Sequence, residues 1–410
     1  MIMKRKIAVI GGGAAGLMAA IAAAESGHDV TVFERNARPA RKVMITGKGR
    51  CNVTNNCDRD TFMANTPHGS RFMFSAFSAF SADDTMRFFE SRGVALKTER
   101  GNRVFPVSDK AVDIVDALVK ATDKAGVKIV NTRVSKIIAQ NEAVTSLVTE
   151  SGKEFFFDKI ILATGGKSYP VTGSTGDGYG MAAELGHKVT ELRPSLVPIM
   201  ISENFCTKLC GLSLKNVKLS LWHKDKKKPI YSELGEMLFT DFGISGPLVL
   251  SASAYIDKDP TEYTVKIDLK PALDTDTLDK RILRDFSAEP NKDFINSLDE
   301  LLPKRLISVI VCNSEIDPRK KVNSITKAER QRLVKEIKEL TMQVFRLRPI
   351  EEAVVTSGGI SLKEIDPATM ESKLISGLYF AGEIIDVDCF TGGFNLQTAF
   401  STGYLAGISV

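Results

Sequence analysis

The feature that most constrains this chain is a glycine fingerprint near its beginning. An apolar run, Lys6–Ile10, leads directly into Gly11-Gly-Gly-Ala-Ala-Gly16, and an alanine-rich stretch follows. In the spacing G-x-G-x-x-G, the first glycine permits a tight turn and the second lets the backbone approach a pyrophosphate. The third glycine allows the following helix to pack against the strand. A strand, this motif and a helix in this order predict a Rossmann-like, dinucleotide-binding α/β domain.

An acidic residue follows the fingerprint at the expected distance. The segment His28–Glu34 has the pattern of a second strand and ends in Glu34, about 20 residues beyond Gly16. A carboxylate at this point can accept hydrogen bonds from both ribose hydroxyls. The basic residues Lys4–Lys6 and the apolar stretch behind them also resemble a secretory signal, but three glycines would disrupt the helix of such a signal. We therefore interpret the beginning of the chain as part of the fold.

The far end of the chain indicates which dinucleotide is bound. An apolar strand, Gly377–Glu383, ends in Gly-Glu, and Thr391–Gln397 opens a helix of small residues, Thr398–Ile408. A glycine and an acid at the end of a strand can hydrogen-bond a ribityl–phosphate chain. A Gly-Gly turn before a helix directs N–H groups at the pyrimidine edge of a flavin. An ordinary strand–helix turn would explain the glycines but not the acids, so we predict FAD rather than NAD.

Composition restricts the class of protein. The 410 residues are 43% hydrophobic and 26% charged, with a net charge of +5, which is typical of a soluble globular protein and weak for a dedicated nucleic-acid binder. No apolar stretch approaches the roughly 20 residues of a membrane span. The six cysteines contain no Cys-x-x-Cys pair and the four histidines do not cluster, so we expect no metal site. Sparse cysteines also favour reduced thiols and a cytoplasmic location.

Several motifs together resemble one family. They are Gly11–Gly16, Arg41–Asn55 with its Thr-Gly-Lys-Gly-Arg-Cys-Asn element, Ala163–Gly166, Phe239–Pro247, Thr356–Gly359 and Ala381–Gln397. Across essentially the whole chain they are similar to bacterial NAD(P)/FAD-dependent, aminoacetone-oxidase-like oxidoreductases, a family that includes a bile-acid-inducible flavoprotein. The resemblance implies a glutathione-reductase-type FAD fold, on the branch of fumarate reductase and succinate dehydrogenase flavoproteins. One residue departs from the family pattern: Cys389 replaces an expected glycine and puts a thiol where the flavin is expected.

These motifs select the residues that we expect around FAD. The polar, glycine-rich loop Lys42–Asn55 is expected to fold over the cofactor, with Arg50 offsetting pyrophosphate charge, although a solvated surface loop is the alternative. Val134 resembles the valine whose backbone meets adenine in related flavoproteins. We expect non-covalent binding, because His28 and His68 are poorly placed in the motifs for attachment. The predicted cofactor-binding residues are Gly11, Gly13, Ala14, Ala15, Gly16, Glu34, Arg35, Lys42, Gly47, Arg50, Cys51, Asn52, Val134, Thr164, Gly165, Gly166, Gly382, Glu383, Asp386, Gly393, Phe394, Asn395, Leu396 and Gln397.

The pattern between these motifs predicts a discontinuous FAD domain. It comprises residues 1–192 and 349–410, interrupted by a β-barrel-like insert at 193–273 and a helical subdomain at 274–348. In the FAD domain, Ser108 can cap a helix, and three segments predict an antiparallel meander before Lys159–Ala163 returns to the parallel sheet: Lys128–Val134, Ala143–Glu150 and Glu154–Phe157. The glycine-rich Gly173–Gly180 lacks the preceding strand and the following acid of a second nucleotide site.

The insert changes from strand-like to helix-like segments. Strands are predicted at Leu196–Ser202, Leu214–His223 and Tyr263–Leu269, and helices at Thr275–Ser287, Asp293–Asn313 and Thr326–Phe345. In the last helix, Leu333, Ile337, Leu340 and Val344 share one face. The stretch Arg319–Arg348 holds ten basic and three acidic residues. We interpret it as a solvated helix face, with an RNA-binding surface as the alternative.

The sequence identifies the catalytic residues less clearly than it identifies the cofactor. The predicted catalytic residues are Cys51, Thr240 and Asp241, and hydride exchange is expected in a cleft between the FAD domain and the insert. Capping of the helix Pro247–Ala254 is an equal alternative for Thr240 and Asp241, and a packed thiol is the alternative for Cys51. Two functions stay open: an FAD-dependent oxidoreductase of a small or sterol-like substrate, with NAD(P)H as a possible transient donor, and a flavoprotein that acts on RNA, as in tRNA modification.

Overall fold

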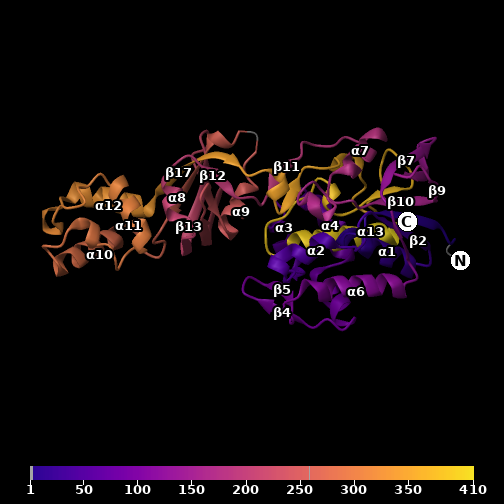
Figure 1. Cartoon of the computed structure of the whole chain (residues 1–410), viewed down its shortest axis with the longest axis horizontal. Coiled ribbons are helices and arrows are strands. Elements are labelled where there is room, and N and C mark those ends of the chain that lie inside the picture. Colours follow the sequence, from indigo (N-terminus) through magenta and orange to yellow (C-terminus); the bar gives the residue numbers. More distant parts are fainter. Residues whose placement is uncertain (1–2, 258) are drawn as a thin grey trace. The chain divides into compact units, whose positions relative to one another are not determined.

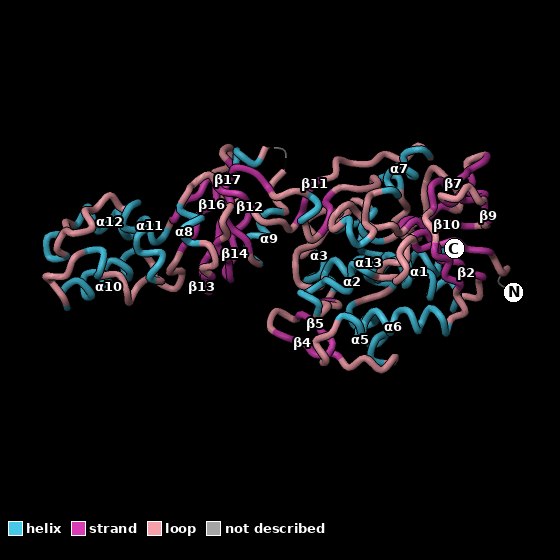
Figure 2. Tube along the Cα trace, viewed as in Figure 1, coloured by secondary structure: helices cyan, strands magenta, loops and turns pink. Residues whose placement is uncertain are grey.

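The computed structural model describes residues 3–257 and 259–410, and the chain forms two compact units. The first unit extends to Ser195 and resumes at Pro349, and the second unit is Leu196–Arg348. Figure 1 labels their elements along the chain, and Figure 2 distinguishes helices from strands. In sequence, the second unit is therefore an insertion into the first.

A five-stranded parallel sheet forms the centre of the first unit. In spatial order its strands are β19 (Leu378–Phe380), β10 (Lys159–Leu162), β1 (Lys6–Ile10), β2 (Asp29–Glu34) and β6 (Lys128–Asn131). The central strands are continuous apolar runs, and Ile7, Val9 and Ile161 have no exposed surface. Such runs are expected where both faces of a parallel sheet are covered.

Two helices from opposite ends of the chain lie side by side next to this sheet. Helix α1 (Ala14–Glu25) follows β1, and α13 (Phe394–Ser409) ends the chain (Figure 1). Small residues allow the close contact, because a Cβ on Gly403 would collide with the carbonyl oxygen of Ala15. The contact brings the beginning of α13 next to the glycine fingerprint.

Smaller elements surround the sheet. The antiparallel strands are β3 (Thr54–Asn55), β5 (Arg103–Pro106) and β4 (Leu96–Glu99); β7 (Val134–Gln140), β8 (Ala143–Thr149) and β9 (Glu154–Phe156); and the pair β11 (Arg193–Ser195) and β18 (Val355–Ser357). The helices are α2 (Arg41–Ile45), α3 (Arg59–Ala64), α4 (Met73–Ala79), α5 (Ala82–Glu90), α6 (Ala111–Lys124) and α7 (Asp177–Glu184).

The second unit combines a closed six-stranded barrel with helices. The barrel order is β12 (Ile199–Ile201), β15 (Gly243–Ser245), β14 (Tyr231–Phe239), β13 (Ser213–His223), β16 (Tyr263–Asp268) and β17 (Leu340–Leu347). The helices are α8 (Phe205–Leu209), α9 (Pro247–Ser253), α10 (Thr275–Ala288), α11 (Lys304–Asn313) and α12 (Lys327–Lys338). One apolar core is shared by barrel and helices.

The predicted Rossmann-like fold is confirmed, but several local predictions are wrong. Lys128–Asn131 is not the first meander strand, because it pairs in parallel with β2 and becomes an edge of the central sheet. Ser108 does not cap α6, whose N-cap is Lys110; the Ser108 hydroxyl instead hydrogen-bonds Asp113. The glycine-rich segment Lys42–Asn55 is not a loop throughout, because it contains most of the short helix α2 and the strand β3.

Of the three helices predicted in the insert, Thr275–Ser287 is confirmed as α10, whereas the other two have wrong bounds. The predicted helix Thr326–Phe345 ends at Lys338, and Leu340–Leu347 is the strand that closes the barrel. The predicted helix Asp293–Asn313 starts too early. Its first part forms only the short 3-10 helix Phe294–Asn296, and the α-helix begins at Lys304, after Pro303. Among the described residues, no helix is long and apolar enough to cross a membrane.

Candidate functional site

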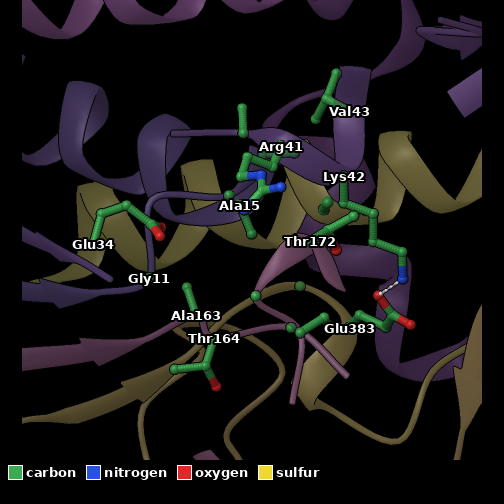
Figure 3. Close-up of a pocket in the computed structure, with 18 of the residues that line it drawn as sticks. Gly11, Ala15, Glu34, Arg41, Lys42, Val43, Ala163, Thr164, Thr172 and Glu383 are labelled. Carbon is green, nitrogen blue, oxygen red and sulfur yellow. Dashed lines mark hydrogen bonds and ion pairs between the residues drawn. The ribbon is translucent and has the colours of Figure 1, made fainter. Parts of the chain in front are cut away.

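A pocket in the first unit lies where its parallel strands end. Its wall includes residues that follow β1, β2, β10 and β19, which meet at the carboxyl edge of the sheet, the usual place for a nucleotide. It holds about 1380 Å³ of empty space, including the part open to solvent. Figure 3 shows side chains from α1, α2 and the β19 end pointing toward this space.

The fingerprint glycines have the geometry that the sequence predicts. Gly11 has a φ of +103°, and a Cβ there would lie 2.5 Å from the carbonyl oxygen of Ala163. A Cβ on Gly16 would collide with the carbonyl oxygen of Gly11, so α1 can pack on the strand only with glycine here. Gly13 faces open space, and no side chain caps the first N–H groups of α1. These free N–H groups are suited to a pyrophosphate.

Glu34 is held rigidly at one end of the pocket. Its side chain is buried, at 6% exposure, although it lines the pocket. Glu34 Oε2 accepts a hydrogen bond from the backbone N–H of Gly12 at 2.7 Å, and Oε1 accepts from the backbone and side-chain nitrogens of Asn36 at 2.7 and 2.8 Å. These three bonds leave one lone pair, on Oε2, to accept from a ribose hydroxyl.

Glu383 is held at the other end by a cation. Lys42 Nζ lies 2.7 Å from Glu383 Oε2 (Figure 3). It also lies 2.6 Å from the hydroxyl of Ser168. Glu383 Oε1 accepts from that same hydroxyl at 2.9 Å and from the backbone N–H of Thr356 at 2.8 Å. Lys42 and Glu383, both predicted to bind the cofactor, therefore act as a pair.

A second ionic contact in the pocket wall lies near the beginning of β7. Asp177 accepts from Arg133 Nε at 2.8 Å and pairs with Arg35 Nη1 at 3.0 Å, and all three residues line the pocket with Val134. Burial is the largest single influence on Asp177 and opposes its ionisation. The hydrogen bonds from Arg133 and Thr175, together with the charges of Arg133 and Arg35, outweigh burial, so the pKa of this carboxyl is lowered. Sequence reasoning missed Arg133 and Asp177, because their partners come from distant segments.

The pocket fits a flavin dinucleotide in its polar groups. The Thr164 hydroxyl lines the pocket, is buried and has no partner among the described residues. Among the residues predicted to bind the cofactor, the pocket is lined by Gly11, Gly13, Ala14, Ala15, Glu34, Arg35, Lys42, Val134, Thr164, Gly165, Gly382, Glu383, Asn395 and Leu396. Those that do not line it are Gly16, Gly47, Arg50, Cys51, Asn52, Gly166, Asp386, Gly393, Phe394 and Gln397.

Two of the predicted residues that do not line the pocket, Arg50 and Gln397, have partners elsewhere in the unit. Arg50 pairs with Glu99 and Asp109, both at 2.5 Å, and these hydrogen bonds raise its pKa; its charge is thus balanced away from the pocket wall. Gln397 is buried and accepts from the hydroxyls of Thr54 at 2.6 Å and Thr85 at 2.8 Å, so it ties α13 to neighbouring elements.

Neither thiol of interest lines the pocket. Cys51 is fully buried in an apolar cluster, and burial raises the pKa of its thiol to about 12. Cys389 is also fully buried, and its sulfur lies 3.2 Å from the hydroxyls of Thr66 and of Thr398, which itself lines the pocket. Burial raises the Cys389 pKa to about 12 as well. Both sulfurs are protonated at neutral pH and are packed rather than exposed.

Thr240 and Asp241 belong to the second unit and do not cap α9, because the N-cap of that helix is Gly246. The Thr240 hydroxyl is buried without a partner among the described residues, and Asp241 is exposed. The capping alternative is therefore wrong, and a role in substrate binding stays a prediction. No group of three or more His, Cys, Asp or Glu in the described part of the chain is arranged to hold a metal ion.

Comparison with known proteins identifies the family. Residues 5–409 match the family described as HI0933-like protein Rossmann domain. This chain belongs to that family. It is 32% identical to a 3-dehydro-bile acid delta(4,6)-reductase of Clostridium scindens, over 98% of each chain. It is also 33% identical to a ribosomal RNA dihydrouridine synthase of Haemophilus influenzae, over 98% of this chain and 97% of the relative.

A solved structure has a similar fold. The 3-ketosteroid-delta4-(5alpha)-dehydrogenase of Rhodococcus jostii RHA1 superposes with a TM-score of 0.53 at 16% identity, covering 100% of this chain and 97% of that protein. These findings confirm the predicted resemblance, the FAD fold and the enzyme class, an FAD-dependent oxidoreductase.

Proposed function

We propose that this oxidoreductase reduces a carbon–carbon double bond conjugated to a carbonyl group, in a small or sterol-like molecule. The observation that carries the proposal is the chemistry shared by two relatives that match nearly the whole chain. A 3-dehydro-bile acid with 4,6 unsaturation and a uracil ring both present a double bond next to a carbonyl. Both relatives are named for saturating that bond.

The residues of the pocket support the binding of FAD for this reaction. Glu34 and the N–H groups at the start of α1 would hold the ribose and pyrophosphate, while the Lys42–Glu383 pair would orient the chain toward the flavin ring. Bound FAD supplies a hydride when reduced and takes one back when oxidised. The protein contributes these positioning groups, set in a largely apolar wall.

NAD(P)H is proposed as a transient donor. The glycine-rich segment after β10 does not form a nucleotide site of its own, because Gly173, Ser174, Thr175 and Asp177 line the same pocket as the fingerprint. A nicotinamide that approaches, transfers a hydride and leaves would need no resident domain. Thr240 and Asp241 stay our proposed substrate-orienting residues.

RNA is the second candidate substrate, and it rests on the relatives named as ribosomal RNA dihydrouridine synthases. The basic stretch of the second unit gives it limited support. Four of its cations pair within the unit: Arg330 with Asp279, Lys320 with Glu329, Lys321 with Asp293 and Lys338 with Asp268. Paired cations offer less charge to phosphates than free ones.

Anaerobic reoxidation of the bound flavin tests the proposal. The FAD-loaded protein, reduced with dithionite, would be mixed with a 3-keto-4-ene steroid, its saturated 3-keto analogue, or a ribosomal RNA transcript. We expect rapid reoxidation by the unsaturated steroid and none by the saturated analogue. Reoxidation by RNA alone would establish the second candidate, and reoxidation by neither unsaturated substrate would contradict the proposed chemistry. A T240V/D241N variant that keeps FAD but reacts unchanged would remove these residues from the substrate site.

A further inference from the structure

We propose that His68 is the proton donor of the reaction, held in place by Asp388. This inference rests on the proposed function, because reduction of a conjugated double bond needs a proton as well as a hydride. Neither residue was selected from the sequence as catalytic, and they are far apart along the chain.

Asp388 is a buried carboxylate with several hydrogen bonds. Its side chain is only 1% exposed. Oδ1 accepts from His68 Nδ1 at 2.7 Å and from the hydroxyl of Ser357 at 3.2 Å, and Oδ2 accepts from the hydroxyl of Ser195 at 2.7 Å. The hydroxyls fix the carboxylate, and the carboxylate fixes the imidazole ring. This leaves Nε2 of His68 as the group that can donate.

The pair adjoins the wall of the FAD pocket on two sides. Asp388 directly follows Val387, which lines the pocket, and His68 and Asp388 form an isolated antiparallel bridge. Gly69 packs against the same valine, since a Cβ there would lie 2.6 Å from Val387 Cγ2. On the other side, Ser195 pairs across β11 and β18 with Val355, which also lines the pocket. His68 and Asp388 therefore do not line the pocket themselves but lie directly behind residues that do.

The exposure of His68 and the charged groups around its ring suit a proton donor that regains its proton from solvent after each turnover. The His68 side chain is 40% exposed, so solvent can return the proton that the ring gives up. The charged groups that act on the ring are Asp388, Asp386 and Arg193. The hydrogen bond to Asp388 is the largest influence and raises the pKa of His68, while burial and Arg193 lower it. The net effect raises the pKa of His68 and so stabilises the imidazolium form relative to the neutral ring.

The step balances in atoms and electrons. The flavin-derived hydride forms a C–H bond at the carbon β to the carbonyl, and the double-bond electrons move to the α carbon. His68 Nε2 releases its proton to that carbon, which completes the saturated product. The imidazole is left neutral and regains a proton from water. The two electrons gained by the substrate are those lost by the reduced cofactor.

A structural role is the competing explanation, in which the pair merely pins the segment before α4 to the segment before α13. Two variants separate these roles. H68Q removes the titrating ring, and D388N keeps the size of the side chain but removes its charge. The control is H223Q in the second unit, because His223 also hydrogen-bonds a carboxylate, Glu262, at 3.0 Å.

The experiment follows reoxidation of dithionite-reduced holoprotein by the 3-keto-4-ene steroid and, separately, by oxygen, which needs no proton on carbon. In H68Q we expect reoxidation by steroid to slow by about 100-fold or more, with FAD content and reoxidation by oxygen unchanged. In D388N we expect the pH profile of reoxidation by steroid to move to lower pH. The histidine NMR titration of the holoprotein should show the His68 pKa falling by the same amount. H223Q should change neither.

If the wild type reduces the steroid, either of two results would overturn the assignment of His68 as the proton donor. One is an H68Q protein with unchanged rate and pH profile. The other is loss of FAD from H68Q together with a D388N profile that does not move with the His68 pKa. A wild type that reduces neither steroid nor RNA would instead overturn the proposed function, so the two failures are distinguishable.

Discussion

The two ends of the FAD pocket each present one carboxylate, but they hold it by different means. Glu34 is fixed by the N–H groups of Asn36, 2 positions away, and of Gly12, 22 positions away in the same strand–helix–strand unit. Glu383 is fixed by Lys42, which lies 341 positions away, and by Ser168. The contacts of the first carboxylate need only the β1–α1–β2 unit, whereas those of the second form only when segments from the two ends of the chain have packed together. The difference separates binding that is encoded locally from binding that depends on the tertiary fold.

We expect neither end of the pocket to bond FAD covalently. Complete release of the flavin on denaturation is therefore the largest effect that we predict. Acid precipitation of the holoprotein should release all of its flavin into the supernatant, because only hydrogen bonds and ion pairs hold it. Absorbance of pellet and supernatant at the flavin maximum measures the partition. Flavin colour that stays with the pellet would contradict the expectation.

Removal of the locally held carboxylate should weaken FAD binding strongly without unfolding the protein. Glu34→Ala removes a charge-assisted hydrogen bond to ribose, worth about 1.5–3 kcal/mol, and also the acceptor that holds the Gly12 N–H in the fingerprint turn, so we expect Kd to rise by about 100-fold. Titration by flavin fluorescence measures this. Glu25→Ala, at the exposed end of α1, is the control. Wild-type flavin occupancy in Glu34→Ala would show that this acid does not contact the cofactor.

Loss of the cation at the other end should have a smaller effect. Lys42→Met leaves Glu383 with its hydrogen bonds from Ser168 and Thr356, so we expect Kd for FAD to rise by about tenfold. A double-mutant cycle with Glu383→Gln isolates the contribution of the pair. Lys48→Met, which changes an exposed lysine of the same loop, should leave Kd unchanged. An effect of Lys42→Met as large as that of Glu34→Ala would remove the distinction between the two ends.

The smallest effect concerns the pH dependence of stability near His68. Because the folded protein raises the pKa of His68, the ring stabilises the fold below its unfolded pKa of about 6.5, and this contribution is lost as pH rises through the folded pKa. The Tm difference between wild type and H68Q should therefore be larger at pH 5.5 than at pH 9. With a partly exposed ring we expect less than about 1 kcal/mol. A Tm difference between wild type and H68Q that grows with pH would contradict the direction of the His68 pKa shift.

The same contrast explains how much the sequence could predict. Lys6–Ile10, the fingerprint and Glu34 form a local pattern, and the structure has each of them as predicted. The His68–Asp388 pair joins residues 320 positions apart, and no local pattern contains it. Arg50 shows the opposite case, because its motif fits the family while its charge is taken by Glu99 and Asp109.

The error at β17 has a different cause. Leu333, Ile337, Leu340 and Val344 fit a helical spacing, but Leu340, Met342 and Val344 also alternate as in a strand, and all three are fully buried. Closure of the barrel decides between the two patterns, since Leu340–Leu347 pairs with both β12 and β16. A short apolar run cannot show which partner will cover it.

Product analysis tests the central claim most directly. The holoprotein, reduced anaerobically with a stoichiometric amount of dithionite, would be incubated with a 3-keto-4-ene steroid or a ribosomal RNA transcript, and the products measured by mass spectrometry. The account predicts a steroid product that has gained two hydrogen atoms, in a yield equal to the flavin oxidised. Flavin that stays reduced, with both steroid and RNA recovered at their original mass, would contradict it.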